Sequence, residues 1–505
     1  MTWLSEHWIV LLILLAYSAL MVVHGWQGHR RTRGVLDYYV GGRNMGGIAI
    51  GLSFFATYSS TNSFVGFAGQ SYTYGAPWLL LAPMIVFFCV LTWVVVAPRL
   101  RRFTEELGSL TIPDFIGFRF DSTAARVLAA FIVIFSSFFY LTAVFKGAGT
   151  SLAVFLDIDY ALAIWVFFFI VMTYTAVGGF ISVVKTDVVQ GLVMIAGAVL
   201  LFRGAINAAG GLTVLDQLRT APETRHLFRW DAAMPLGVLL GIITAGTIKL
   251  IVEPRQLSRF YGLRDARAVR AGFVTATLSF LLVYALLVPI GLYARVIMPD
   301  GVAHTDEIVP ALLTNPAFFH PVISAFLLVA LVAAAMSSID SVLLVMAATF
   351  HRDLVALVRP VASERTTIFA TAVYVAVFAF ITTLLALHPP GGIVALTTFS
   401  GSLYAACFFP AMLFGLYWHR GDGRAVVISM LVGLAVLLAW KPLALAGIHE
   451  VFPALAASIA AYVLTAARSA GPPGVRRLFE RTAPAGAEPA VARAVSRTVL
   501  GQQAS

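Results

Sequence analysis

The chain has 505 residues, of which 60% are hydrophobic and 11% charged, with a net charge of +10 and a mean hydropathy of +0.90. This composition excludes a multidomain soluble protein and is typical of a polytopic α-helical membrane protein. The positive charge is therefore expected in basic loops rather than in a nucleic-acid interface, and the two cysteines, Cys89 and Cys407, form no CxxC pair and no disulfide framework.

Apolar runs of about 20 residues, long enough to cross a bilayer as helices, recur along the chain. The first run is too long and too lightly basic at its start for a cleaved signal peptide, so we expect it to remain as a helix. The sequence predicts about thirteen transmembrane helices. They lie near residues 8–26, 47–67, 76–97, 124–153, 159–177, 186–208, 234–252, 268–296, 320–350, 366–387, 392–417, 424–441 and 451–467.

Basic clusters predict the orientation, because cytoplasmic loops of membrane proteins are enriched in Lys and Arg. The clusters follow the odd-numbered predicted helices, at residues 30–43, 99–126, 185, 255–270, 352–365 and 420–424. An odd number of helices with the N-terminus outside places all of them in the cytoplasm. We therefore predict a multi-pass protein of the cytoplasmic (inner) membrane, surrounded by lipid, with a cytoplasmic C-terminus.

The C-terminal segment from Ser469 is rich in Ala, Pro, Gly and Arg and lacks apolar periodicity. Residues 469–505 are therefore predicted to form a disordered cytoplasmic tail, too short for a sensor-kinase domain. The sequence contains no HExxH, Walker or Gly-x-Ser-x-Gly motif and no Cys/His cluster with metal-ligand spacing. It does not predict an enzyme, and no obligatory protein partner is evident.

One segment of the ninth apolar run, Ala-Ala-Met-Ser-Ser-Ile-Asp-Ser, carries an unusual set of polar side chains. Four of its residues share one helical face, because they are spaced i, i+3, i+4 and i+7; they are Ala334, Ser337, Ser338 and Ser341. Asp340 lies near the edge of that face, and a carboxylate within the membrane favours a functional site. These oxygens suit a hard cation such as Na⁺, whereas the alternative is a serine-rich face that hydrogen-bonds to a neighbouring helix.

The second predicted helix is expected to be interrupted. Gly41-Gly-Arg-Asn-Met-Gly-Gly47 opens it, and Ala56-Thr-Tyr-Ser-Ser-Thr-Asn-Ser63 places hydroxyls and an amide inside it. An interruption near the middle of the membrane frees backbone carbonyls, which are tolerated only where they line a site or a water-filled cavity. Further along, Asp187 is predicted to enter the sixth helix within its first turn, where a carboxylate alternatively stabilises the helix dipole.

Several motifs together resemble the sodium:solute symporter family, the relatives of bacterial proline, pantothenate and sodium–sugar symporters. They occur in the family's order and extend over about 40–430. They are Gly-Gly-Arg at 41–43, Thr111-Ile-Pro-Asp-Phe with Arg119-Phe120, Tyr174-Thr-x-x-Gly-Gly-Phe-x-Ser before Thr186-Asp-x-x-Gln190, Ala335-Met-Ser-Ser-x-Asp-Ser341, and Phe409-Pro410 with Trp418-x-Arg420.

This resemblance implies the LeuT-like fold, in which two inverted five-helix repeats are flanked by extra helices. On this chain it predicts an N-terminal helix and loop at 1–40, repeats at 41–210 and 211–420, and two C-terminal helices at 421–468. It implies a secondary active transporter that couples Na⁺ movement to uptake of a small organic solute. An H⁺-coupled symporter on the same fold and a non-transporting solute sensor are the alternatives.

The family pattern also assigns ion sites. One Na⁺ site is expected from three backbone carbonyls and two hydroxyls, those of Ala56, Ser59, Ala334, Ser337 and Ser338. A second Na⁺ or H⁺ site is expected around the Thr-Asp carboxylate, from Asp187, Ser337, Asp340 and Ser341. Two carboxylates favour a cation there, and a buried carboxyl that holds a proton is the rival interpretation.

Solute contacts are expected near the interrupted helix and on the seventh helix, at Ser60, Asn62, Ser63 and Thr244. Two further positions that correspond to sugar contacts in the family are the apolar Ala82 and Ile85, which weighs against a sugar.

Two lysines, Lys146 and Lys249, lie within predicted helices, and a buried ammonium needs a partner. That partner is either an internal acid such as Glu253 or an anionic group of the solute. The second option favours a carboxylate-bearing solute such as a monocarboxylate or an amino acid. Glu253 and Arg255 are themselves expected to be either a gating ion pair or simply solvated loop charges.

Overall fold

The computed structural model describes residues 2–230, 234–359, 363–443 and 447–482. Within these ranges, ten helices are long and apolar enough to span a membrane. Three shorter apolar helices cover Gly47–Tyr58, Tyr160–Thr173 and Val451–Ala466. The spans occur where the thirteen helices are predicted, so the all-α polytopic fold class is confirmed.

The elements of the first part of the chain reach residue 209. In order, they are α1 (Thr2–His29), α2 (Val35–Val40), η1 (Gly41–Arg43), α3 (Gly47–Tyr58), η2 (Asn62–Gly66), α4 (Phe67–Tyr74), η3 (Ala76–Leu80), α5 (Leu81–Leu91), η4 (Thr92–Val96), α6 (Ala97–Leu107), α7 (Ile112–Phe120), α8 (Thr123–Leu156) and α9 (Tyr160–Ala209).

The second part begins with a short helix after residue 210. Its elements are α10 (Val214–Thr220), η5 (Arg225–Phe228), α11 (Leu236–Val252), α12 (Pro254–Tyr261), α13 (Ala266–Leu287), α14 (Ile290–Ile297), η6 (Thr305–Glu307), α15 (Ile308–Thr314), α16 (Pro321–Thr349), η7 (Phe350–Val355), α17 (Ala356–Val358), α18 (Glu364–Leu387), α19 (Ile393–Tyr417), α20 (Gly423–Leu443), α21 (Val451–Ala466) and α22 (Val475–Arg481).

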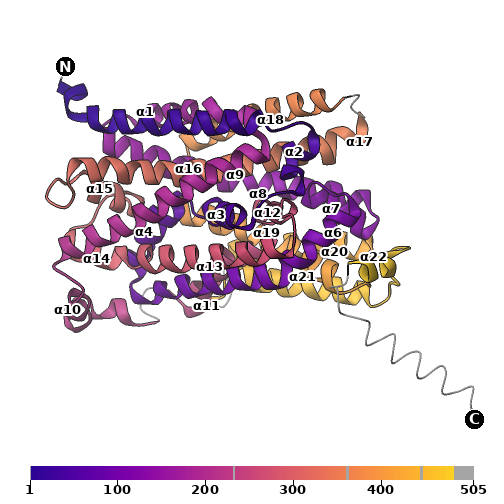
Figure 1. Ribbon diagram of the computed structural model, residues 1–505. Coiled ribbons are helices and arrows are strands. Elements are labelled where there is room, and N and C mark those ends of the chain that lie inside the picture. Colours follow the sequence, from indigo (N-terminus) through magenta and orange to yellow (C-terminus); the bar gives the residue numbers. More distant parts are fainter. Residues whose placement is uncertain (1, 231–233, 360–362, 444–446, 483–505) are drawn as a thin grey trace, which may run out of the picture.

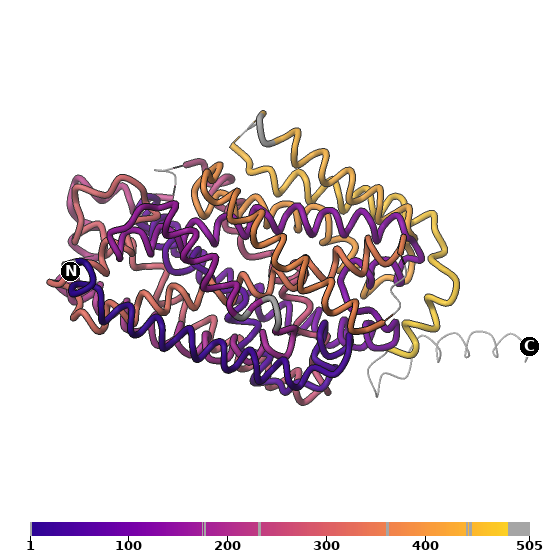
Figure 2. Tube along the Cα trace, turned by 90° about the horizontal axis from the view of Figure 1, so that it is seen from above, coloured from indigo at the N-terminus to yellow at the C-terminus, as the bar shows by residue number. Residues whose placement is uncertain are grey.

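The helices form one elongated bundle in which α16 and α19 are central and α1 is peripheral. In α16 and in α19, 83% of the most apolar stretch is buried, against 28% in α1. Figures 1 and 2 show α1 on one side of the bundle and the α20–α21 pair on the opposite side. Exposed Leu, Val and Phe side chains on the outer helices are the surface expected against lipid.

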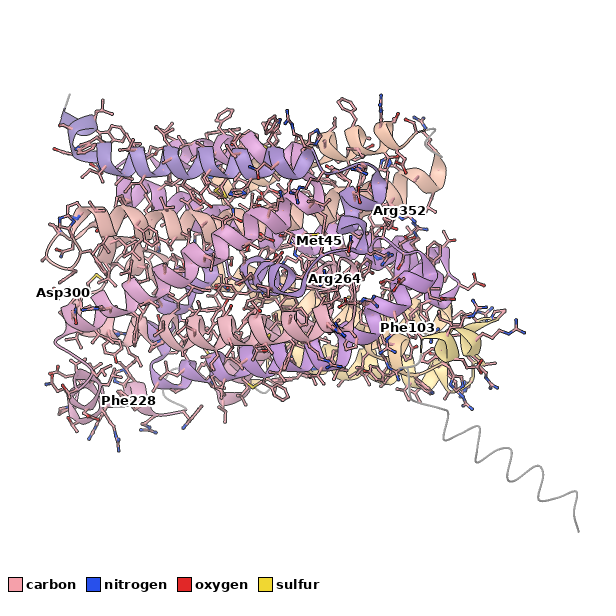
Figure 3. All side chains as sticks on the ribbon, viewed as in Figure 1. Met45, Phe103, Phe228, Arg264, Asp300 and Arg352 are labelled. Atoms are coloured by element: carbon pink, nitrogen blue, oxygen red, sulfur yellow. The ribbon has the colours of Figure 1, made fainter. Side chains whose placement is uncertain are left out.

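The two ends of the bundle differ in charge, and Figure 3 labels residues at each. Asp300 and Phe228 lie at the end where α1 begins, and Arg352 and Phe103 lie at the other. We call these the Asp300 end and the Arg352 end. The loops at the Arg352 end carry the basic clusters, which include Arg99, Arg101 and Arg102 on α6.

The second predicted helix is interrupted as expected: α3 ends, and after a short break the chain becomes helical again in η2 and α4. The α3 helix ends at Tyr58, Ser59 is extended (φ −73°, ψ 112°), and a wide turn over η2 leads into α4. The break therefore leaves carbonyls near residues 56–59 without their helical partners, as any helix end does.

A second break separates α11 from α12 at Glu253. Glu253 is extended (φ −74°, ψ 123°) and Pro254 opens the next helix. The physical reason is Pro254, because a proline disfavours helical geometry in the residue before it yet suits the first position of a new helix. Backbone pairing of Met45 with Gly262 and Arg264 holds the end of α12 against the start of α3, as Figure 3 shows.

Two predictions about local structure are wrong. The connection expected between residues 177 and 186 is much shorter, because two helices within α9 meet at Gly179 (φ 63°, ψ −176°), and Asp187 therefore lies two turns inside the second helix rather than in its first turn. The tail is ordered at its start, because α22 packs Phe479 edge-on against Phe103 at 5.1 Å and Arg481 pairs with Glu106 at 2.8 Å. Residues 483–505 lie outside the described part.

Candidate functional site

The break in α3 meets the serine face of α16 in the buried centre of the bundle. The Ser337 hydroxyl lies 3.0 Å from the Ala56 carbonyl and 3.1 Å from the Ala334 carbonyl. The Ser338 hydroxyl lies 3.1 Å from the Thr57 carbonyl and 3.4 Å from the Ser59 carbonyl. The structure thus brings all five residues of the predicted first Na⁺ site together, with Thr57 as an additional neighbour.

A second polar cluster lies next to the first, where α3, α9, α12 and α16 meet. The Asp187 carboxylate accepts from Ser53 at 2.6 Å and pairs with Arg259 at 3.2 Å through the same oxygen. The Arg259 guanidinium also donates to Thr57 Oγ1 at 2.8 Å and to Ser341 Oγ. Asp187 and Ser341, both predicted for the second ion site, are therefore joined by a guanidinium.

Asp340, the other predicted carboxylate, contacts a different helix. Its Oδ1 accepts from the Thr175 hydroxyl of α9 at 2.5 Å, and the residue is fully buried. The structure therefore places Asp340 near the second cluster, within electrostatic reach of Arg259.

Two basic residues of the cluster that follows the seventh predicted helix are buried in the core. Arg255 pairs with Glu253 at 2.6 Å and donates to the Thr57 carbonyl at 2.6 Å. Arg255 and Arg259 are 2% and 1% exposed, so of the two alternatives for Glu253 and Arg255 the structure shows an ion pair and not solvated loop charges. The reason is again Pro254, which restarts a helix that carries both side chains back into the bundle.

Lys249 of α11 is buried without an acidic partner. Its ammonium lies 5.1 Å from the centre of the Tyr58 ring and 5.2 Å from that of Tyr140. No described carboxylate forms an ion pair with it, because Glu253 is engaged by Arg255. Aromatic faces attract a cation, although more weakly than a carboxylate would.

Lys146 of α8 has a protein partner instead. Its ammonium pairs with Asp306 at 2.9 Å and donates to the Gly391 carbonyl at 3.2 Å. The pair lines a hollow of about 570 Å³, together with residues of the 304–306 segment. Of the two partners considered from the sequence, the structure gives Lys146 the internal acid.

The remaining predicted solute contacts surround the α3 break. Ser63 Oγ lies 2.8 Å from the Tyr284 hydroxyl, which also contacts Ser59 Oγ at 2.9 Å. Ser60 and Asn62 are joined at 3.2 Å through the Ser60 hydroxyl, and Asn62 Oδ1 has no hydrogen-bond partner among the described residues. Thr244 is half-buried on α11.

Sequence reasoning missed four residues of these clusters. Tyr140 donates to Ser338 at 3.2 Å. The other three are Thr57, Tyr284 and Arg259, whose contacts are given above. Their contacts join helices distant in the chain, so no local spacing could reveal them. Arg259 alone offered a signal, namely its place five residues after a proline that follows an apolar run.

Comparison with known proteins identifies the family and agrees with the fold. The sequence profile described as the Sodium:solute symporter family matches residues 38–433. The sodium/pantothenate symporter of Haemophilus influenzae is 28% identical over 451 residues, which cover 86% of this chain and 91% of that protein. The osmoregulated proline transporter OpuE of Bacillus subtilis is 30% identical over 467 residues, which cover 90% of this chain and 94% of that protein.

Solved structures show the same architecture. A substrate-bound outward-open state of a Na⁺-coupled sialic acid symporter superimposes with a TM-score of 0.80 at 20% identity, over 92% of this chain and 98% of that one. The nucleobase-cation-symport-1 transporter MHP1 in a closed conformation gives a TM-score of 0.55 at 14% identity, over 88% and 98%. Both are LeuT-fold transporters, which confirms the predicted fold.

The buried Arg255–Glu253 pair generates a prediction about stability. Glu253→Gln should destabilise the protein by about 3–5 kcal/mol, because it leaves the Arg255 charge buried and uncompensated. Thermal unfolding of the purified protein measures this loss. Glu223→Gln, at an exposed turn, is the control and should change stability by less than about 0.5 kcal/mol; equal midpoints for the two variants would contradict the prediction.

Proposed function

Because the chain belongs to the sodium:solute symporter family, and is thus a Na⁺-coupled symporter of a small solute, we propose that its solute carries a carboxylate. The predicted family, Na⁺ coupling and solute transport are confirmed. In the proposal, Na⁺ is held by the Ala334–Ser338 face and the α3 break, and the carboxylate is received by Lys249. The buried ammonium of Lys249, flanked by two tyrosine rings, is the observation that supports the choice of solute.

The first Na⁺ site is supported by the chemistry of the oxygens that converge there. Hard cations prefer carbonyl and hydroxyl oxygens, and the centre of the bundle offers four carbonyls and two hydroxyls within one cluster. Both hydroxyls belong to α16, and the carbonyls that they contact on the neighbouring helix belong to the C-terminal end of α3. An ion in this cluster would bridge the two helices, so its arrival and departure would change how they pack.

Removal of one ligand tests this site. Ser337→Ala should raise the Na⁺ concentration for half-maximal uptake about tenfold, which corresponds to ~1.4 kcal/mol. Solute flux into proteoliposomes, with Na⁺ replaced by choline at fixed pH, measures the change. Ser324→Ala is the matched control, because Ser324 is a buried serine near the start of the same helix. Uptake that persists in choline and depends on a pH gradient would favour H⁺ coupling instead.

The carboxylate is supported by the position of Lys249 relative to the ion cluster. Tyr140 contacts Lys249 through its ring and Ser338 through its hydroxyl, and Tyr58 is the last helical residue before the α3 break. An anionic group on Lys249 would thus lie one side chain away from the Na⁺ ligands. Opposite charges at that separation favour each other's binding, which is the basis of coupled transport.

The two lysines give a matched test of the solute site. Lys249→Gln should raise the KM for a carboxylate solute between tenfold and a hundredfold, because a charge-assisted hydrogen bond contributes about 1.5–3 kcal/mol. Lys146→Gln removes an ammonium that is paired with Asp306 and should leave the KM nearly unchanged. A screen of carboxylates, amino acids and sugars for Na⁺-dependent thermal stabilisation would identify the solute. Equal effects of the two substitutions on KM would refute the assignment.

We also propose the orientation and the repeat boundaries. The basic Arg352 end faces the cytoplasm by the positive-inside rule, which places the start of α1 outside and α22 inside. The two repeats, 41–210 and 211–420, each begin with a broken helix, α3–α4 in the first and α11–α12 in the second. An N-terminal unit at 1–40 and two helices at 421–468 flank them.

Thiol labelling in intact cells tests the orientation. A cysteine introduced as Ser5→Cys should react with a membrane-impermeant maleimide added outside, whereas Ala470→Cys should react only after the cells are opened. The native Cys89 and Cys407 are buried and should give little background. Labelling of Ala470→Cys from outside would reverse the proposed topology.

A further inference from the structure

The α20–α21 pair has no role in the clusters described above, and it lies at one side of the bundle (Figures 1 and 2). Its two helices run antiparallel. Ser429 of α20 contacts Ser458 of α21 at 3.0 Å, and the hydroxyl of Ser469, after α21, donates to Asp422, before α20, at 3.1 Å. The start of α20 therefore lies beside the end of α21.

Two arginines lie at this end of the pair. Arg424 is in the first turn of α20, and Arg468 follows the last residue of α21 by two positions. Both residues are exposed, and neither guanidinium forms an ion pair or a hydrogen bond with a residue that the structure describes. The neighbouring carboxylate of Asp422 is engaged elsewhere, because its Oδ1 accepts from two backbone N–H groups of α20 and its Oδ2 from Ser469. Both guanidinium groups are thus available to an anion.

The same end of the pair exposes apolar side chains directly beside the arginines. Ile428 follows Arg424 by four residues and Leu464 precedes Arg468 by four, so each lies on the same helical face one turn closer to the middle of the membrane. Leu464 is 70% exposed and Ile428 is 42% exposed. All four side chains line one hollow of about 530 Å³, together with Asp422, Thr465 and Ser469. The hollow is therefore basic at its outer edge and apolar one turn further in.

We propose that this hollow binds an anionic phospholipid. Its phosphate would lie between Arg424 and Arg468, because the arginine fork matches the geometry of phosphate oxygens. Its acyl chains would run along Ile428 and Leu464 toward the centre of the bilayer. Basic pockets between transmembrane helices are known to receive anionic lipid head groups, and here the charged and apolar parts of the hollow follow one another in the order in which a lipid presents them.

A soluble anion fits the hollow less well than a lipid does. Inorganic phosphate would contact both guanidinium groups but would leave Ile428 and Leu464 in contact with water. A zwitterionic lipid would cover the apolar side chains but would bring no net charge to the arginines. The combination of the two features therefore favours a lipid that carries a net negative charge.

Lipid binding to the purified full-length protein in detergent tests the inference. Native mass spectrometry with dioleoylphosphatidylglycerol should show a lipid that the Arg424→Gln/Arg468→Gln double variant binds about tenfold or more weakly, since each arginine near a membrane surface contributes to anionic-lipid binding. Dioleoylphosphatidylcholine should bind the parent and the variant equally. The matched control is Arg267→Gln/Arg270→Gln, which removes two exposed arginines of α13 that do not line this hollow and should leave phosphatidylglycerol binding unchanged.

A charge-conserving variant keeps the test decisive if the glutamine variant folds poorly. Arg424→Lys/Arg468→Lys should retain most of the phosphatidylglycerol binding, because both positive charges remain. Equal losses in the α20–α21 variant and in the α13 control would overturn the lipid site. Inorganic phosphate that raises the unfolding temperature of the parent as much as phosphatidylglycerol does would show a site for soluble anions instead. Neither result would affect the proposed solute and Na⁺ sites, whose residues none of these variants changes.

Discussion

The break after Tyr58 in α3 is the constraint on which the rest of the site depends. A helix end inside a membrane leaves carbonyls that lipid cannot satisfy. Here the freed carbonyls of Ala56 and Thr57 accept from side chains of other helices, namely Ser337 and Ser338 of α16 and Arg255 of α12. The unfavourable backbone geometry is therefore retained only because two distant segments supply donors at that position, and the same oxygens become available to a cation when those segments move.

Helix α12 connects the two polar clusters, because its two arginines contact different atoms of Thr57. Arg255 donates to the Thr57 carbonyl, beside the first cluster, and Arg259 donates to the Thr57 hydroxyl, within the second. A displacement of this short helix would change both clusters together. Binding at either site can then bias one conformational equilibrium, and such shared bias is the physical requirement for coupling between sites.

Sequence patterns predict what depends on local spacing and miss what depends on distant contacts. The i, i+3, i+4 spacing of Ala334, Ser337 and Ser338 is enough to put them on one helical face, and the hydroxyls within the second predicted helix indicate its break. Arg255 and Arg259 look like part of a basic loop, because charge after an apolar run usually marks the cytoplasmic side. They are not in a loop, because Pro254 starts a new helix that carries both side chains into the core.

The charge of the solute and the number of coupling ions constrain each other. One Na⁺ moving inward gains ~2.3 kcal/mol from a potential of about 100 mV and ~1.4 kcal/mol from a tenfold gradient. A carboxylate on Lys249 that travels with a single Na⁺ cancels the electrical contribution, so only the concentration term remains. A second coupling ion would restore a net positive charge to the transported set, so that the membrane potential would drive uptake of the anion. A carboxylate on Lys249 and coupling to two ions therefore support each other physically.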